Sequence, residues 1–318
     1  MKPTFRSLLS LIAVGALASA CSAPGDPAPP AGPAAPVEPM VRTIAEVPGG
    51  TGGLELGPDG AVYSSEFGDT LDQGPMGTRV FRVTPDGEVS LFAEGFDGAS
   101  GNAFDAAGRF VQSNIRGNTI SLVAPGGAIT TLTADGLQNP VGVIQGADGD
   151  FYVANCGGNS VVHVTPDGTS SVFSDDPLLK CPNGIAQGSD GAFYVSNFYN
   201  GDVVRVAEDG ADARLLVTVP GDNNGHLVFG NGVLYVAGRG AHQIFQVGLD
   251  GETEVVAGSG ARGHADGPAG EATLSLPNDL ALSADGRTLY FNEVGSLDPD
   301  TRILFPTLVR AIILPGAP

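Results

Sequence analysis

KCPNGIAQGSDGAFYVSN, residues 180–197, is the stretch that decides the fold. Pro-Asn-Gly leads into an apolar run, Asp190-Gly191 follows, and then Phe-Tyr-Val precedes Asn197. Asp-Gly between two short apolar runs is a strong hairpin signal, because glycine accepts the backbone conformation that a tight turn needs. The stretch therefore predicts two antiparallel strands joined at Asp190-Gly191.

The same pattern occurs six times along the chain. Its turn glycines are spaced about 40 to 55 residues apart, at Gly60, Gly108, Gly149, Gly191, Gly232 and Gly286. A second turn follows each of them, at Gly87, Gly127, Gly168, Gly210, Gly251 and Gly316. Four short strands per repeat and six repeats are typical of a β-propeller. The predicted fold class is all-β, a six-bladed propeller of four-stranded antiparallel blades.

The ends of the chain are expected to close the ring. The last repeat supplies only three strands before the chain ends. VRTIAEV, Val41–Val47, resembles the outer strands of the other repeats and precedes the first blade. We expect this N-terminal strand to complete the last blade, which leaves no open sheet edge there.

Three insertions interrupt the regular spacing, at about residues 67–78, 258–276 and 294–306. All three fall in connections between the second and third strands of a blade or between blades, and none falls at an Asp-Gly turn. These connections share one face of an up-and-down propeller. Long loops on one face of a rigid scaffold commonly carry function, although neutral insertion is the alternative.

The N-terminal residues predict export. Lys2 and Arg6 precede an apolar run, Leu8–Leu17, that is too short to span a membrane. Small residues before Cys21 resemble a bacterial lipoprotein signal, with ordinary secretion as the alternative. The expected organisation is a signal peptide over residues 1–20, a lipidated Cys21 with a Pro/Ala-rich tether over 21–40, and the propeller over 41–318. The expected location is the bacterial cell envelope, outside the cytoplasm, at the periplasm or the cell surface.

Charge and cysteine content restrict the partners. The chain carries 35 acidic and 15 basic residues, a net charge of −20. Such a surface repels phosphate backbones, so we expect no nucleic-acid partner and membrane contact only through the lipid. Cys156 and Cys181 lie in connections of adjoining blades on the long-loop face. Outside the cytoplasm we expect them to form a disulfide, with free thiols or a redox pair as alternatives.

Two stretches resemble known families. VVAGSGARGHADGPAGEATLSLPNDLALSADGRTLYFNE, residues 255–293, resembles NHL-repeat propellers of bacteria. The repeats PNGIAQGSDGAFYVSN and PVGVIQGADGDFYVAN resemble the senescence-marker-protein and gluconolactonase superfamily of six-bladed propellers. That resemblance implies a divalent cation, often Ca²⁺, on the propeller axis, with Asn183, Asn278 and Asp279 as ligands. Gly52 and Gly53 occupy the place where these relatives carry an acid.

Other polar residues are candidates for function. Asn183 also fits a structural Asx turn. His226 aligns at or beside Gly184 and Asp279, at the mouth of the channel, and is either a general base, a ligand or a packed polar group. Glu66 ends the second strand of blade one, where three of the six blades have Asn. The predicted catalytic residues are therefore His226, Asp279 and Glu66.

Two main functions remain open at this point, with a lyase or a purely structural envelope role as further alternatives. The leading hypothesis is binding of a small molecule or peptide on the long-loop face, without turnover. The alternative is a divalent-cation-dependent hydrolase of lactones or related esters, which the gluconolactonase resemblance implies. The sequence lacks Ser-His-Asp order, a phosphate loop, and zinc or haem motifs. It also lacks tryptophan, which argues against a streptogramin lyase, because those relatives carry Trp-Phe-Thr in their blades.

Overall fold

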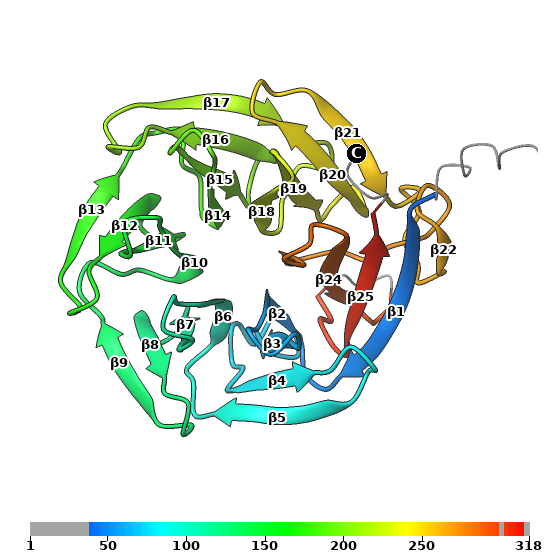
Figure 1. Ribbon diagram of the computed structural model, residues 1–318, viewed down its shortest axis with the longest axis horizontal. Coiled ribbons are helices and arrows are strands. Elements are labelled where there is room, and N and C mark those ends of the chain that lie inside the picture. The colour runs from blue at the N-terminus through cyan, green and yellow to red at the C-terminus, as the bar shows by residue number, and fades with distance from the viewer. Residues whose placement is uncertain (1–37, 299–301, 315–318) are drawn as a thin grey trace, which may run out of the picture. The chain divides into compact units, whose positions relative to one another are not determined.

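The computed structural model describes residues 38–298 and 302–314. Six sheets surround a central axis, so the predicted all-β six-bladed propeller is confirmed (Figure 1). The predicted signal peptide, Cys21 and nearly all of the predicted tether lie outside the described residues. Within the described part of the chain, no helix is long and apolar enough to cross a membrane.

Blades one to five each contain four antiparallel strands in sequence order. Blades one and two are β2 (Thr51–Leu56), β3 (Val62–Glu66), β4 (Arg79–Val83), β5 (Val89–Glu94), β6 (Ala99–Phe104), β7 (Phe110–Asn114), β8 (Thr119–Val123) and β9 (Ile129–Thr133). Blades three and four are β10 (Pro140–Gln145), β11 (Phe151–Asn155), β12 (Ser160–Val164), β13 (Ser170–Ser174), β14 (Pro182–Gln187), β15 (Phe193–Asn197), β16 (Asp202–Val206) and β17 (Ala213–Thr218). Blade five is β18 (Leu227–Gly230), β19 (Val233–Gly238), β20 (Gln243–Gly248) and β21 (Thr253–Ala257).

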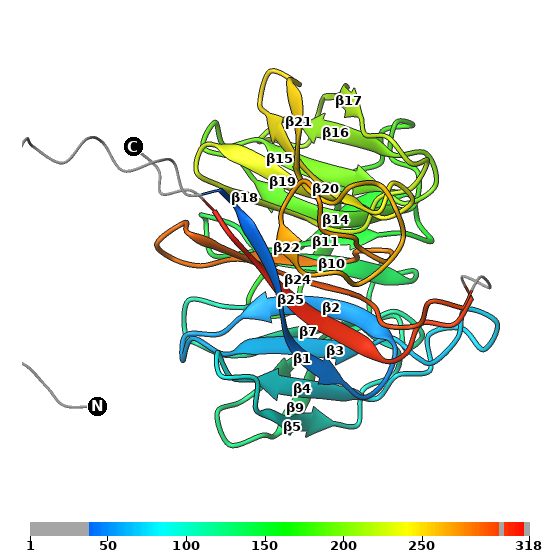
Figure 2. The ribbon, with the colours of Figure 1, turned by 90° about the vertical axis from the view of Figure 1, so that its right-hand side faces the viewer.

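Blade six joins the two ends of the described chain. It contains β23 (Leu280–Leu282), β24 (Thr288–Val294), β25 (Thr307–Ile313), β1 (Met40–Val47) and β22 (Gly267–Pro268). β1 pairs antiparallel with β25 and closes the ring, as predicted (Figures 1 and 2). The insertion over residues 258–276 adds β22 as a fifth, two-residue strand outside β1, which the sequence pattern did not indicate.

Neighbouring blades pack through the apolar faces of their sheets. Between blades three and four, Tyr152 and Val161 belong to the same buried cluster as Ile185 and Phe193. The ring centroids of Tyr152 and Phe193 are 4.1 Å apart. Each such buried side chain stabilises the fold by about 1.5–3 kcal/mol. This packing holds the inner strands rigidly around the axis.

The three insertions meet on one side of the molecule. The loops at 67–78 and 294–306 pair with each other, since Leu304 N donates to Asp69 O at 2.8 Å, and they project together in Figure 2. Leu276 of the third insertion packs in a small buried cluster with Val294 and Leu304, against which Phe67 rests. The long loops therefore form one structural unit over blades one and six.

Candidate functional site

One position of the innermost strand lies at the narrowest part of the channel. Backbone pairing with the second strand places six residues at this position in blades one to six: Gly53, Gly101, Gly142, Gly184, His226 and Asp279. The glycines allow the blades to approach closely. A Cβ at Gly142 would lie 2.5 Å from Asn183 O, and one at Gly184 would lie 2.6 Å from His226 Cα. Blades five and six are thus distinguished by carrying side chains at this position.

The His226 ring reaches across the channel. A Cβ at Gly101, in blade two, would lie 3.0 Å from His226 Cε1, although His226 belongs to blade five on the opposite side. His226 Nδ1 lies 3.2 Å from Asp279 Oδ2. Both side chains are buried, and His226 borders a cavity on each side of the ring. His226 therefore separates two pockets along the axis.

The first cavity, which we call the long-loop pocket, opens on the face of the insertions. It has a volume of about 210 Å³. Its walls are mainly apolar and include Phe67, Leu71, Ile115, Phe198, Tyr199 and Leu304. Its polar lining includes Asn183, Asn278, His226 and Arg239. The predicted functional face thus carries an apolar pocket with a few polar groups at its base, as small-molecule sites commonly do.

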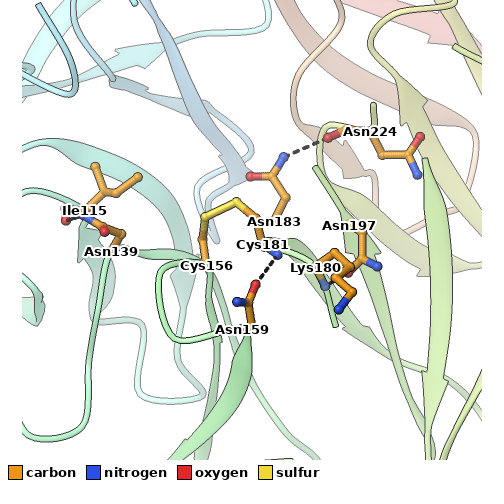
Figure 3. The surroundings of a disulfide bond; sticks show 9 residues. All are labelled: Ile115, Asn139, Cys156, Asn159, Lys180, Cys181, Asn183, Asn197 and Asn224. Atoms are coloured by element: carbon orange, nitrogen blue, oxygen red, sulfur yellow. Dashed lines mark hydrogen bonds between the residues drawn. A yellow bond between two sulfur atoms is a disulfide. The ribbon is translucent and has the colours of Figure 1, made fainter. Parts of the chain in front are cut away.

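A disulfide forms part of the wall of the long-loop pocket. Cys156 and Cys181 are bonded, which confirms the predicted pairing (Figure 3). Cys181 N donates to Asn159 Oδ1 at 2.8 Å. The bond ties the loop after β11 to the start of β14, so it fixes blades three and four where they border the pocket.

Arg239 is a functional candidate that sequence reasoning missed. It is 7% exposed and lines the long-loop pocket. Its Nη1 donates to Leu276 O and Asn278 Oδ1, both at 3.2 Å. Within residues 38–298 and 302–314, no carboxylate forms an ion pair with it. Burial, together with the charge of Arg262, lowers the pKa of Arg239 to about 10, so it remains charged at neutral pH.

A signal for Arg239 exists in the repeat. It follows directly after the second strand of its blade. The corresponding residues of blades one to four all line the long-loop pocket: Phe67, Ile115, Cys156 and Phe198. Among these five positions Arg239 is the charged one. An alignment of the residue after each second strand would therefore have indicated it.

The second cavity, which we call the carboxylate pocket, opens toward the Asp-Gly turns and has a volume of about 300 Å³. Glu55 and Asp279 line it. Burial raises the pKa of Glu55 to about 7, against the opposing effect of the hydrogen bond from Leu56 N. The Glu55 side chain is partly exposed within the cavity, and the walls of the channel surround it. Glu55 is not among the site residues that the sequence predicted.

His226 and Asp279 form a buried pair that disfavours charge. Burial raises the pKa of Asp279 well above its usual value, and the nearby Glu55 raises it further. Two backbone donors oppose this shift, Leu54 N at 2.9 Å and Leu280 N at 2.7 Å. Burial lowers the pKa of His226 to about 4, so the imidazole is neutral at pH 7. A neutral imidazole beside a carboxyl group can accept or relay a proton.

Glu66 lies apart from His226 and Asp279. Its carboxylate accepts two hydrogen bonds from Arg79, at 2.7 and 2.9 Å, and it lines neither pocket. Glu293, the corresponding acid of blade six, is fully buried and pairs with Arg310 at 2.9 Å. The structure therefore places both acids in ion pairs that hold strands and loops together.

No protein-family model matches the chain, and no curated protein matches its sequence. Solved structures do resemble it. A gluconolactonase from Xanthomonas campestris has a TM-score of 0.66 at 18% identity, over 90% of this chain and 99% of that one. The fold is that of gluconolactonase-like six-bladed propellers. The predicted resemblance is confirmed at the level of the fold.

Other structural neighbours have different descriptions. A virginiamycin B lyase from Staphylococcus aureus has a TM-score of 0.62 at 16% identity, over 87% of this chain and 100% of that one. An auxiliary nutrient binding protein from Bacteroides thetaiotaomicron has a TM-score of 0.65 at 15% identity, over 86% of this chain and 76% of that one. At these identities the likeness shows the fold alone.

The residues expected to hold a cation on the axis do not fit one. Asn183 Nδ2 donates to Asn224 O at 3.0 Å (Figure 3), and Asn278 Nδ2 donates to Gly52 O at 2.8 Å. Asn278 Oδ1 already accepts from the Arg239 guanidinium, which would repel a cation. The Asp279 carboxylate lines the carboxylate pocket instead. A hard cation needs several convergent oxygens, preferably carboxylates, and the side-chain oxygen of Asn183 does not by itself supply them, because the Asn278 oxygen contacts Arg239 and Asp279 accepts two backbone N–H groups.

A different group has the composition of a cation site. Asp148, Asp150 and His163 bring their ligand atoms within 4.8 Å of one another, and they are the one such group of His, Cys, Asp or Glu in the described residues. They lie at the turn between β10 and β11 and on β12, away from the channel lining. Asp148 accepts from Tyr152 Oη at 2.7 Å, and His163 Nε2 lies 2.7 Å from Asp150.

Proposed function

We propose that the protein binds a small molecule or the end of a peptide in the long-loop pocket, and holds it without turnover. The observation that supports this function is the pocket itself, which has apolar walls, a disulfide in its wall and His226 at its floor. Apolar pockets with a few placed polar groups are the usual form of ligand sites. One structural neighbour is described as a nutrient binding protein.

Exposed apolar side chains support the same face. Leu71, Met76, Tyr199, Leu297 and Phe305 are exposed on the connections of this face. Leu71 and Tyr199 line the pocket itself, and exposed apolar side chains at a pocket are typical of an interaction site, because their contact with water is unfavourable. They would extend the contact area for a ligand that protrudes from the pocket.

The proposal includes attachment to the bacterial cell envelope through a lipid on Cys21. The apolar segment and the small residues before Cys21 support it. The Cys156–Cys181 disulfide is in keeping with a compartment outside the cytoplasm. Metabolic labelling with a fatty-acid analogue would label the wild type and not a Cys21→Ser variant. Equal labelling of both would contradict the anchor.

A fragment screen tests the binding function. Ligand-observed NMR would use the full chain and two variants that each remove an exposed apolar side chain. Tyr199 is 72% exposed at the pocket and Val172 is 61% exposed on the outer strand β13. We expect Tyr199→Ala to weaken bound fragments at least about fivefold, since it removes apolar contact, and Val172→Ala to leave them unchanged. Hits that are insensitive to Tyr199→Ala would contradict the proposed site.

A second function is supported by the carboxylate pocket. Glu55, with a pKa near 7, could act as a general base toward a lactone or ester, beside the His226–Asp279 pair. One neighbour is described as a gluconolactonase. A screen of lactones and esters with and without a chelator, together with metal analysis of the purified protein, separates the two functions. Turnover that is lost in Glu55→Gln would favour the hydrolase, and the absence of both turnover and bound metal would exclude it.

A further inference from the structure

We propose that Arg239 is the anchor for a carboxylate, so that the long-loop pocket takes a small organic monoanion with an apolar body. This ligand class rests on the binding function proposed above. It is inferred from the charge of Arg239, from the lack of a carboxylate paired with it in the described residues, and from the volume and lining of the pocket.

Arg239 differs from the other deeply buried arginine. Arg310 is 0% exposed and pairs with Glu293 at 2.9 Å and with Asp266 at 2.8 Å. Buried charges in proteins are normally compensated in this way, because removing a charge from water is costly. Arg239 is nearly as buried, yet within the described residues it contacts only the neutral oxygens of Leu276 and Asn278. Its charge therefore has no acidic partner among residues 38–298 and 302–314.

The surroundings of Arg239 favour an anion. Burial is the main cause of the lowered pKa values of Arg239 and His242; the charge of Arg262 lowers both further, and the charge of Arg239 also lowers that of His242. His226, on the same pocket, is neutral at pH 7 because burial lowers its pKa to about 4. The chain as a whole has a net charge of −20. The lining of the long-loop pocket, in contrast, includes one cation, Arg239, and no acid. A field of this sign attracts negative groups and repels cations.

The geometry of the guanidinium favours a carboxylate. Within the described part of the chain, both hydrogen bonds of the Arg239 guanidinium come from Nη1, and Nη2 and Nε donate none. A guanidinium edge offers two parallel N–H donors, which match the two oxygens of a carboxylate. One uncompensated positive charge is neutralised by one negative charge, so a monoanion fits better than a doubly charged phosphate.

The rest of the pocket defines the body of the ligand. Phe67, Ile115, Phe198 and Tyr199 line it with apolar and aromatic surface. Its volume of about 210 Å³ is below the usual range for drug-sized ligands, which begins at about 300 Å³. The matching ligand is therefore a small aromatic or branched aliphatic acid, or the C-terminal carboxylate of a peptide with an apolar last residue.

A tryptophan reporter makes the test direct, because the chain contains no tryptophan. Tyr199→Trp places a single indole on the pocket wall. The full-length protein carrying this change would be titrated with benzoate, phenylacetate and phenylpropionate, and with the three corresponding neutral amides. We expect at least one acid to bind about tenfold or more tightly than its amide, since a hydrogen bond to a charged group gains more than one to a neutral group.

Variants of Arg239 separate recognition from a structural role. Arg239→Met removes the charge at similar size and should abolish the preference for acid over amide, while binding of the amide persists. Arg239→Lys keeps the charge without the two-donor edge and should retain part of the preference. The control is Arg205→Met, since Arg205 pairs with Asp190 at the Asp-Gly turn and lines neither pocket. This control should keep the full preference.

The outcomes distinguish the two proposals. If acids and amides bind equally in the reporter protein, or if Arg239→Met keeps the preference, Arg239 is a structural link and the inference is wrong, while the binding function stands. If no probe of either kind changes the emission of Trp at position 199, both the ligand class and the proposed pocket function are overturned.

Discussion

The two pockets on the propeller axis have opposite electrostatic character. The long-loop pocket combines apolar walls with one buried cation, Arg239, whereas the carboxylate pocket contains Glu55 and Asp279. The His226 ring lies between them. Both pockets are built from the same six inner strands, and they differ through the residues on either side of one ring of glycines. A repeated scaffold therefore gains two distinct sites through single-residue departures from its repeat.

Blades five and six carry most of those departures. Blades one to four have glycine at the narrowest position, while His226 and Asp279 replace it in the last two. Blade six also carries the fifth strand and the buried Glu293–Arg310 pair. The same part of the ring thus contains the closure of the fold and the polar groups of the channel. Substitutions and changes of pH or metal content can separate the closure of the fold from the polar groups of the channel.

The largest effect is expected at the buried arginines. Arg310→Met would leave Glu293 buried without its arginine partner, beside His264 and the Ser275 N–H, and should lower the free energy of unfolding by about 3–5 kcal/mol. Arg239→Met should change it by less than about 1 kcal/mol, because no carboxylate of the described residues pairs with Arg239. Chemical denaturation measures both. Equal losses would show that Arg239 is as structural as Arg310 and would remove the contrast between the two residues.

The narrowness of the axis gives the next effect. A Cβ at Gly184 would lie 2.6 Å from His226 Cα, so Gly184→Ala should cost about 2–3 kcal/mol, since backbone must shift to admit it. Gly126 is the matched control, because a Cβ there meets nothing within 4 Å. Gly126→Ala should leave the unfolding midpoint nearly unchanged. If both variants are equally stable, the blades are not in close contact at the ring, and His226 does not separate the pockets.

The carboxylate pocket should show a pH-dependent effect. Because the folded-state pKa of Glu55 is about 7, against an ordinary 4.5, the folded chain binds this proton more tightly than the unfolded chain. Its contribution to stability is therefore lost as the pH rises from 4.5 to 7. Glu55→Gln should be more stable than the wild type by about 2 kcal/mol at pH 8 and about equal to it at pH 4; the full difference in pKa would give roughly 3 kcal/mol, but solvent screens this partly exposed side chain.

Thermal unfolding of both proteins across this pH range measures the difference. Asp86→Asn provides a control, because Asp86 lies in the turn after β4, outside both pockets. A constant difference between Glu55→Gln and the wild type from pH 4 to pH 8 would show that Glu55 is solvated like an ordinary carboxylate.

The smallest effect is expected from metal removal. A cation present at a free concentration 100 times its dissociation constant would stabilise the fold by about 2.7 kcal/mol. Since the Asn278 oxygen contacts Arg239 and the Asp279 carboxylate accepts two backbone N–H groups, we expect Ca²⁺ or a chelator to change the melting temperature by less than about 1 °C. A larger increase with Ca²⁺ that Asn183→Ala abolishes would restore the axial cation site.

Much of the fold was predictable because its signals are local. Asp-Gly turns and alternating strands repeat along the chain, so the six blades and the closing strand followed from spacing. The Cys156–Cys181 bond followed from their positions in adjoining blades. β22 was not predictable, because two residues in a Gly-rich loop carry no strand pattern. Its pairing depends on the exposed edge of β1, which only the closed ring supplies.

The candidate site was less predictable, because burial on the axis is a property of the whole ring. His226 and Asp279 were aligned at the channel from the repeat, and they do meet there. Arg239 was missed since a single arginine after a strand resembles an ordinary surface residue until its burial is known. Glu55 was missed for the same reason, since an acid within a strand resembles a surface residue. Which face of the channel each acid reaches depends on packing between blades and not on spacing.

A pair of tryptophan reporters tests the central claim most directly, namely that the ligand site is the long-loop pocket. Tyr199→Trp reports from that pocket, and Phe229→Trp reports from the carboxylate pocket. Each is the single tryptophan of its protein. With phenylacetate as the probe, we predict a saturable change in the emission of Trp at position 199 and none at position 229. A saturable change at position 229 alone would contradict the account and place the ligand among the carboxylates.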